Sequence, residues 1–479
     1  MTSPKKTKKV LIVVCLVLAA VLAGGIGALA WYRSAHLTVN DTSYSRDITR
    51  LDLSGTPSPE LDKLAELPGL QQLNLRDTGI SIEEYEAVRA ALPDCEILWS
   101  VPFQGGFLPD DTEEITIASL TDADVAVLAA YLPGLSKVQA EGCTDYAQLM
   151  ALRAAFPQAD VSYSVSVNGL SWPMDTVEMV LTDADAEALS AAIPYLPGLK
   201  AVTLEGQLPP AEELNALRQA YPGIRFYWQI QLFGQTFDVD TTELDLSGIP
   251  MESVAEVESA VAYLPSLERV YMHHCGISNE EMDALNRRHE TIRFIWTVQV
   301  GHIQVPTDAI TFMPTGNGYF VNDTQCYNLR YCTDMVCVDM GHQPISSCEF
   351  VAFMPKLKYL ILVDTYVTDI SPLANHEELI FLELFLTDIT DFSPLLSCTN
   401  LEDLNICYTY ADVEVISQMT WLNNLWWSPC STERYEILQA RLPDTFLMVN
   451  TFSSTDKGWR HLQNYYDHRD LLGLPYADQ

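Results

Sequence analysis

Leu357 to Leu373 reads LKYLILVDTYVTDISPL, and Leu379 to Leu395 reads LIFLELFLTDITDFSPL. Both stretches begin with the pattern L-x-x-L-x-L, which returns at Leu401 to Ile406. Successive residues of a strand point to opposite faces, so the leucines share one face and the intervening residues share the other. The fourth position of the pattern recurs every 22 residues, at Leu360, Leu382 and Leu404. This spacing predicts short strands that stack on one another, because no single turn can bury its own leucines.

A longer period runs through the first two thirds of the chain. The pattern Leu-Pro-Gly/Ser-Leu recurs at intervals of 64 to 68 residues, at Leu67, Leu132, Leu196 and Leu264. Extended segments keep the same step, with PDCEILWSV from Pro93 and PGIRFYWQI from Pro222 as two examples. Leu51 to Gly55 (LDLSG) is repeated letter for letter at Leu244 to Gly248. Three landmarks in one phase predict four long repeats of about 65 residues over 47–308.

Each long repeat reads as strand, helix, strand, helix, strand. In the first, we expect one helix to start at Ser58-Pro59, since a capping residue precedes a proline at the first helical position. A second helix starts at the capping box Ser81 to Glu84 and stops at Pro93. Glycine within alternating residues predicts a β-hairpin late in the repeats. The hairpins are expected at Val165 to Trp172, Ile230 to Phe237 and Val298 to Val305.

The short repeats resemble those of internalin-like leucine-rich-repeat proteins of bacterial surfaces. In that family L-x-x-L-x-L is followed by T/N-x-I-x-D-I-x-P-L, and the matching runs here are Thr365 to Leu373 and Thr387 to Leu395. The second run departs from the pattern, with Phe392 where isoleucine is usual. The match is specific over Lys356 to Pro429 and looser over 47–308. The resemblance implies an α/β leucine-rich-repeat solenoid with a stacked parallel sheet, here with hairpin insertions and an N-terminal transmembrane helix.

The chain divides by pattern into six segments. Val10 to Ala30 contains no charged residue and follows four lysines within a nine-residue stub. A helix of 21 residues spans about 31 Å, enough for the hydrocarbon core, and the lysines place the stub in the cytoplasm. A signal peptide cut after Ala30 is the alternative. The segments are 1–9 (cytoplasmic stub), 10–30 (transmembrane helix or signal anchor), 47–308 (long repeats), 309–355 (irregular, cysteine-rich joint), 356–429 (short repeats) and 430–479 (a helix-and-strand cap with an extended tail).

Charge and cysteine content narrow the class of protein. The net charge is −37, and the only basic residues before Ala30 are four lysines, so the exported part is more acidic still. Such a surface repels phosphate backbones, which excludes nucleic acid as a partner. Seven of the eleven cysteines fall between Cys326 and Cys430. In an exported chain this density predicts disulfide bonds there.

No catalytic constellation has convincing spacing, so we expect neither an enzyme nor a cofactor. His273 and His274 are adjacent on a predicted strand, where neighbouring side chains point to opposite faces, so we expect no metal site there. Asp238 and Asp240 could hold calcium through their carboxylates, but an aspartate that caps its own turn explains them better. No metal or catalytic residue is therefore assigned.

The candidate binding residues face away from the leucines of the short repeats. Stacked in register, they form one apolar column, and exposed contiguous apolar surface marks interaction sites. The alternative is that another part of the chain, a hairpin or the joint, covers this face. The candidate residues are Tyr359, Ile361, Phe381, Phe385 and Trp426.

The sequence therefore predicts an extracellular recognition module that is held at the cell membrane by a single span. Its partner would be a protein or a glycan, and signal cleavage would instead make it a secreted protein. A second hypothesis is a structural spacer or assembly component of the cell envelope with no specific ligand. The apolar column separates the two, because a spacer needs only polar residues on its outward positions.

Overall fold

The computed structural model describes residues 14–18, 20–21, 24–25, 31–314, 320–449 and 458–476. The chain forms two compact units, Met1–Tyr227 and Trp228–Gln479. Their boundary lies inside the predicted array of long repeats rather than at its end. Most of the predicted span at 10–30 lies outside the described residues, and none of the helices that are described is both long and apolar enough to cross a bilayer.

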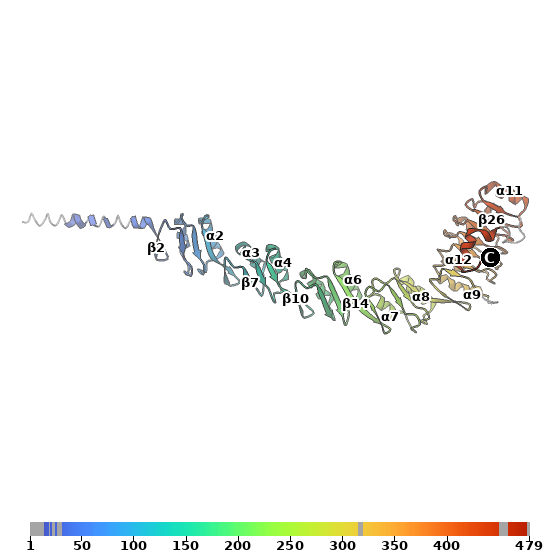
Figure 1. Cartoon of the computed structure of the whole chain (residues 1–479), viewed down its shortest axis with the longest axis horizontal. Coiled ribbons are helices and arrows are strands. Elements are labelled where there is room, and N and C mark those ends of the chain that lie inside the picture. Colours follow the sequence, from blue (N-terminus) through green and yellow to red (C-terminus); the bar gives the residue numbers. More distant parts are fainter. Residues whose placement is uncertain are drawn as a thin grey trace, which may run out of the picture. The chain divides into compact units, whose positions relative to one another are not determined.

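The first unit repeats parallel strands joined by helices, as its pattern predicts (Figure 1). In the first repeat Leu51, Leu73 and Ile97 are register partners on three adjacent parallel strands. Each of these residues faces the interior of its turn, where Leu51 and Leu73 are buried. The strands and helices of this unit before its last strand are β1 (His36–Val39), β2 (Thr42–Ser45), β3 (Arg50–Asp52), η1 (Leu61–Glu66), β4 (Gln72–Leu75), α2 (Ile82–Ala91), β5 (Glu96–Phe103), β6 (Gly106–Pro109), β7 (Glu114–Thr116), α3 (Asp122–Tyr131), β8 (Lys137–Gln139), α4 (Tyr146–Ala155), β9 (Asp160–Ser162), β10 (Ser164–Val167), β11 (Leu170–Pro173), β12 (Glu178–Thr182), α5 (Ala186–Ala192), η2 (Ile193–Tyr195), β13 (Ala201–Glu205) and α6 (Ala211–Ala220).

The two predicted helix starts of the first repeat differ in outcome. Ser81 Oγ accepts a hydrogen bond from the backbone N–H of Glu84, and the Glu84 carboxylate accepts one from the backbone N–H of Ser81, so the capping box of α2 is confirmed. Ser58 does not cap a helix, because its φ of 53° places it in the left-handed region. The chain turns there, and the short 3₁₀ helix η1 begins only at Leu61.

The predicted hairpins are present, and their register is the one the pattern requires. Val165 pairs with Trp172, and the same relation holds between Ile230 and Phe237 in β14 (Arg225–Leu232) and β15 (Gln235–Asp238). The two-residue turn Asn168-Gly169 has φ values of 51° and 73°. Two successive positive φ values define a type I′ turn, which follows the twist of the strands and favours Asn-Gly.

The second unit contains one more long repeat and then a sheet of seven parallel strands. Leu360, Leu382 and Leu404 are successive register partners in this sheet and are fully buried. The remaining elements are β16 (Glu243–Asp245), α7 (Ala255–Val261), β17 (Arg269–Tyr271), α8 (Asn279–Arg288), β18 (Arg293–Ile295), β19 (Thr297–Val300), β20 (Ile303–Pro306), β21 (Thr311–Phe312), α9 (Asp323–Cys326), η3 (Tyr327–Tyr331), β22 (Cys337–Asp339), η4 (Glu349–Phe353), β23 (Tyr359–Ile361), η5 (Ser371–Leu373), β24 (Phe381–Glu383), η6 (Ser393–Ser397), β25 (Asp403–Asn405), α10 (Val413–Ile416), β26 (Asn424–Trp426), α11 (Thr432–Arg441), β27 (Phe446–Met448), η7 (Trp459–His461) and α12 (Gln463–Leu471). By its own repeats and parallel register, the protein is a leucine-rich-repeat solenoid of the α/β class.

The expectation of an irregular joint at 309–355 is wrong for the part of it that is described. β21 and β22 belong to the seven-stranded sheet and pair in parallel with one another and with β23. The pattern was hidden because Met335, Val338 and Met340 occupy the inward positions that leucine holds elsewhere, and all three are fully buried. The flexible thioether side chain of methionine fills such a core as leucine does.

The expected disulfides are also not formed. The eleven cysteines are free thiols, and eight of them are buried. Cys326, Cys332 and Cys348 are among the buried ones, and burial raises the pKa of each thiol to about 12. A thiol in such surroundings is protonated and behaves as a small apolar side chain.

The C-terminal segment is not an extended tail. The predicted cap is present as α11 and β27, with β27 at the edge of the seven-stranded sheet. Beyond it, η7 and α12 pack against the sheet face that points away from the leucines. We call this surface the outer face of the sheet, and residues 458–476 the C-terminal cover.

Candidate functional site

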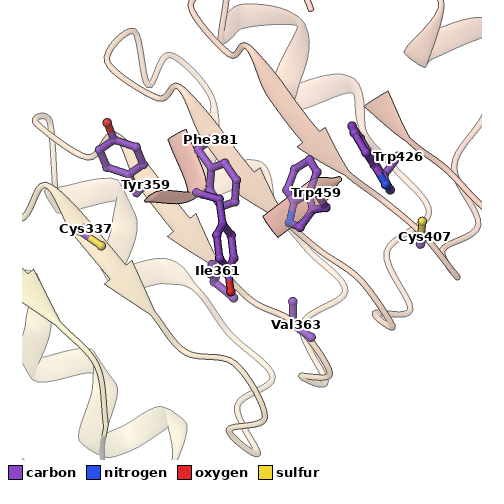
Figure 2. Packing of buried hydrophobic residues seen from close by; sticks show 9 residues of the cluster. Cys337, Tyr359, Ile361, Val363, Phe381, Cys407, Trp426 and Trp459 are labelled. Atoms are coloured by element: carbon purple, nitrogen blue, oxygen red, sulfur yellow. The ribbon is translucent and has the colours of Figure 1, made fainter. Parts of the chain in front are cut away.

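The sheet places the predicted binding residues side by side. Tyr359 is the register partner of Phe381, and Asn405 is the register partner of Trp426. Adjacent strands lie about 4.8 Å apart, so the side chains of these positions form a continuous surface. Figure 2 shows Tyr359, Phe381 and Trp426 along the outer face with Trp459 among them.

The outer face is covered, however, so the expected exposed patch does not exist. Phe381 and Trp426 are 0% and 1% exposed, and Tyr359 and Ile361 are only 8% and 7% exposed. The ring of Trp459 from η7 lies 5.0 Å from that of Phe381 and 5.2 Å from that of Trp426. Phe385 alone among the predicted residues is half-buried. The alternative prediction, that another part of the chain covers this face, therefore holds. The covering element is the C-terminal segment rather than a hairpin or residues 309–355.

A polar contact fixes the cover beside the aromatic cluster. The side-chain amide of Asn464 donates to Asp403 Oδ2 at 2.9 Å, and that of Asn424 donates to Asp403 Oδ1 at 2.7 Å. Asp403 is 2% exposed, so both carboxylate oxygens depend on these donors for the hydrogen bonds they have lost to water. The cover is therefore aligned by a buried hydrogen bond as well as by apolar packing.

Between the cover and the sheet lies a cavity of about 460 Å³. This size falls within the roughly 300–1,000 Å³ typical of small-molecule sites. Outward residues of β22 to β24 and the turns after them form its floor, and residues of η7 and α12 form its roof. Charged and polar residues dominate the lining, and six of them are Asp339, Glu383, Arg460, Tyr465, His468 and Arg469.

Two carboxylates stand on the floor, on strands separated by one other strand. Asp339 and Glu383 are both register partners of Ile361, which lies between them. Burial raises the pKa of Asp339 above its usual value and that of Glu383 to about 7. Glu383 is 4% exposed and accepts a hydrogen bond from Asn405 Nδ2 at 3.4 Å. When ionised, a carboxylate as deeply buried as that of Glu383 calls for a compensating cation.

The roof contributes one buried histidine. His468 is 1% exposed, and its Nε2 atom lies 3.8 Å from Asp339 Oδ2, too far for a hydrogen bond. Neither ring nitrogen has a hydrogen-bond partner among the described residues. Burial lowers the pKa of His468 to about 4, so the ring is neutral near pH 7 and offers one donor and one acceptor.

Two arginines from the cover line the same cavity. Arg460 is exposed, and Arg469 is half-buried and donates from Nε to the backbone oxygen of Pro475 at 3.0 Å. A guanidinium carries five N–H donors, so this contact leaves Arg469 with donors to spare. The cavity is therefore polarised, with negative charge on the strand side and positive charge on the cover side. This arrangement suits binding of a charged group, and we identify no nucleophile paired with a base in it.

Sequence reasoning missed the residues that make this cavity. Glu383 offered a signal, because it interrupts an apolar column at the central outward position between Phe381 and Phe385. Asp339 lies in β22, within residues 309–355, which the sequence predicted to be an irregular joint. His468 lies in α12, within the C-terminal segment that was expected to be extended. Their proximity depends on a chain reversal that no local pattern encodes.

The other polar candidates have local roles. His273 Nδ1 lies 2.9 Å from Thr297 Oγ1. The backbone N–H of Asp240 donates to Asp238 Oδ1 at 3.1 Å, which is the contact that the turn interpretation predicts. Across the described ranges, no three His, Cys, Asp or Glu side chains gather as metal ligands would.

Comparison with known proteins gives only distant likenesses. No family model and no curated protein matches the chain. Among solved structures, internalin C2 of Listeria monocytogenes is 20% identical over 32% of this chain and 78% of its own, with a TM-score of 0.24. A second Listeria monocytogenes internalin is 16% identical over 86% and 91%, with a TM-score of 0.24. A leucine-rich-repeat protein of Leptospira interrogans is 14% identical over 84% and 96%, with a TM-score of 0.20. The fold assignment rests on the repeats of this chain and not on these likenesses.

Proposed function

We propose that this protein is an extracellular recognition module, held at the membrane by its N-terminal segment, that binds its ligand in the cavity under the C-terminal cover. The observation that carries the proposal is the pair of carboxylates on the floor of that cavity, of which Glu383 is buried and Asp339 half-buried. A scaffold without a ligand gains nothing from buried carboxylates, since burying charge costs free energy unless it is paired.

The cavity also changes the kind of partner expected. A protein that docked on the outer face of the sheet would have to displace Trp459 and α12, which pack on the aromatic cluster. A small molecule, or one end of a protein or glycan, needs only the space already present. The recognition hypothesis therefore moves from the apolar column to the polar cavity beside it.

The structural spacer is the competing function, and one observation favours it. The apolar column argued against a spacer, because a spacer needs no apolar outward residues. The C-terminal cover packs on that column, so the column no longer requires a ligand to explain it. Under the spacer hypothesis, the cavity is an unfilled gap between cover and sheet, and no compound binds there.

A blocking variant tests the proposal with the full-length protein in detergent. Gly341 lines the cavity, and a Cβ at this position would lie 3.1 Å from Asp339 Oδ1 and 3.6 Å from Ile361 Cγ2. Gly341→Leu should therefore fill the cavity. The matched control is Gly134→Leu in the first unit, where an added Cβ meets no atom within 4 Å.

The measurement is the shift in Tm produced by a library of metabolites, short peptides and oligosaccharides. We expect at least one compound to raise the Tm of the wild type and of Gly134→Leu but not of Gly341→Leu. A library that shifts no Tm, or shifts all three proteins equally, would support the spacer.

A further inference from the structure

We propose that the cavity binds a small zwitterion, a compound with a primary ammonium group and a carboxylate a few bonds apart, such as a free amino acid or a short peptide. This inference rests on the proposed function and names the class of ligand for that site. It follows from the positions of the charged groups around the cavity.

The strand side of the cavity fits an ammonium group. Asp339 and Glu383 flank Ile361 on the floor, and no lysine or arginine among the described residues lies within ion-pair distance of either carboxylate. The nearest cationic candidate is His468, whose ring is neutral because burial lowers its pKa. A ligand ammonium between the two carboxylates would supply the missing positive charge and three N–H donors.

The cover side fits a carboxylate. Arg460 and Arg469 both line the cavity from this side, and Arg469 retains donors beyond its contact with Pro475. A guanidinium presents paired N–H donors that match the two oxygens of a carboxylate. A purely cationic ligand would gain nothing from these arginines and would be repelled by them.

His468 supplies an observation independent of the charges. Its buried ring borders the cavity, and both its nitrogens lack a hydrogen-bond partner among the residues described. Buried polar atoms are almost always paired in native proteins. A zwitterion held between floor and cover brings both an N–H donor and a carboxylate acceptor within the same small volume, so it can pair with a neutral imidazole.

The size of the cavity limits the ligand. About 460 Å³ accommodates an amino acid or a dipeptide but lies at the low end of the range for small-molecule sites. The half-buried ring of Phe385 and the side chain of Val363 also line it and provide an apolar surface for a side chain of the ligand. The geometry therefore favours amino acids with an apolar side chain.

The proposed ligand class is tested by isothermal titration calorimetry of the full-length protein with the common L-amino acids and with the dipeptide Leu-Leu. For any that binds, the N-acetyl and the methyl ester derivatives are then compared, since each removes one of the two charges. We expect both derivatives to bind at least tenfold more weakly than the parent compound. This comparison uses the wild-type protein, so it does not depend on whether a variant folds.

Variants assign the two charges to residues. Glu383→Gln removes the floor charge with little change of shape, and it should weaken binding of the parent by about thirtyfold. Arg460→Gln changes an exposed group and should weaken binding only about threefold. Glu377→Gln, at an exposed glutamate of the preceding repeat, is the matched control and should bind as the wild type does.

Proton release gives a readout that general destabilisation does not produce. An ammonium bound at the floor favours the ionised form of Glu383, so binding near pH 6.5 should release protons, seen as heats that depend on the buffer. Glu383→Gln should abolish most of that release. The other charged or titratable groups that line the cavity with Glu383 are Asp339, His342, Arg460, Tyr465, His468 and Arg469.

The outcomes separate this inference from the proposed function. If no amino acid or dipeptide binds, but another compound raises the Tm of the wild type and not of Gly341→Leu, the ligand class is wrong and the binding function stands. Equal binding by the N-acetyl or ester derivative would also overturn the class. If no compound of either set binds, both proposals fail.

Discussion

Glu383 and His468 face the same cavity and are perturbed in opposite directions. Burial raises the pKa of Glu383 to about 7 and lowers that of His468 to about 4, so it favours the neutral form of each group. The two shifts act on stability over nearly the same pH range with opposite signs. The contribution of Glu383 to the free energy of unfolding is lost as pH rises from 4.5 through about 7. The contribution of His468 is lost as pH falls from 6.5 through about 4.

Glu383→Gln should therefore become more stable relative to the wild type as pH rises. Below pH 4.5, the carboxyl is protonated in both folded and unfolded chains, and the two proteins should be similar. Above pH 7, the wild type must bury a charge, and the variant should be more stable by about 3 kcal/mol. Urea unfolding from pH 4 to pH 8 measures the difference. A difference that does not change with pH would contradict the raised pKa.

His468→Gln should show the opposite trend. Above pH 6.5 the imidazole is neutral in both the folded and the unfolded chain. The difference in stability between variant and wild type at that pH therefore serves as the reference. As pH falls toward 4, the wild type loses stability because its unfolded chain gains a proton that the folded chain excludes, so the variant should gain about 3 kcal/mol relative to it. The same unfolding series checks this, with Gln463→Ala on an exposed face of α12 as a control that should follow the wild type.

At the scale of elements, the C-terminal cover packs on the sheet through a fully buried aromatic side chain. Trp459 is fully buried and contacts Phe381 and Trp426 through ring centroids 5.0 and 5.2 Å apart. Aromatic pairs at these distances add about 0.5–1.5 kcal/mol to what burial alone provides. The segment from Trp459 to Leu471 is too short to be a stable helix by itself, so it depends on the sheet.

Trp459→Ala should detach the cover and lower stability by about 3–5 kcal/mol. Hydrogen exchange of α12 should then become fast while exchange of β24 and β25 stays slow. Phe446→Ala, at an aromatic that is 50% exposed on the same sheet, is the control and should cost much less. Slow exchange of α12 in the variant would show that Asn464 and the remaining contacts suffice.

Phe381→Ala tests whether the aromatic column is core or ligand site. The side chain is 0% exposed, so its removal should lower stability by about 3–5 kcal/mol. In a double-mutant cycle with Trp459→Ala, the coupling should be about 1 kcal/mol, since the two rings are in contact. Additive effects would mean that the cover is not seated on Phe381.

At the scale of the whole molecule, the state of the thiols reports on both units at once. Cys15 is exposed, Cys95 and Cys430 are half-buried, and the other eight cysteines are buried. Cys15 lies in the predicted membrane span, so we expect only Cys95 and Cys430 to react with a water-soluble thiol reagent in the native protein. All eleven thiols should react after unfolding without reductant. Fewer than eleven reactive thiols would show that disulfides form in the protein.

Attachment to the membrane is the second whole-molecule prediction. The uncharged run from Val10 to Ala30 is long enough to span a bilayer, so the protein should remain with membranes after alkaline extraction. Sequencing of the N-terminus of the mature protein checks the alternative. A mature chain that begins at Trp31 would show that the run is a cleaved signal.

The sequence by itself determined the repeats, the strand register and the hairpins, because these depend on residues close together in one turn. Leu360, Leu382 and Leu404 recur at one interval, and a single strand period then decides which side chains point outward. Where methionine and valine replaced leucine, at Met335 and Val338, the same local pattern was overlooked.

The tertiary structure alone decided what lies on the outer face of the sheet. Trp459 and His468 reach Phe381 and Asp339 across 78 and 129 residues of chain, and no periodicity links them. Contacts between segments so far apart depend on how the chain folds back after β27, which the sequence of either segment does not specify. The exposed aromatic patch thus became a covered core, and the polar cavity beside it became the candidate site.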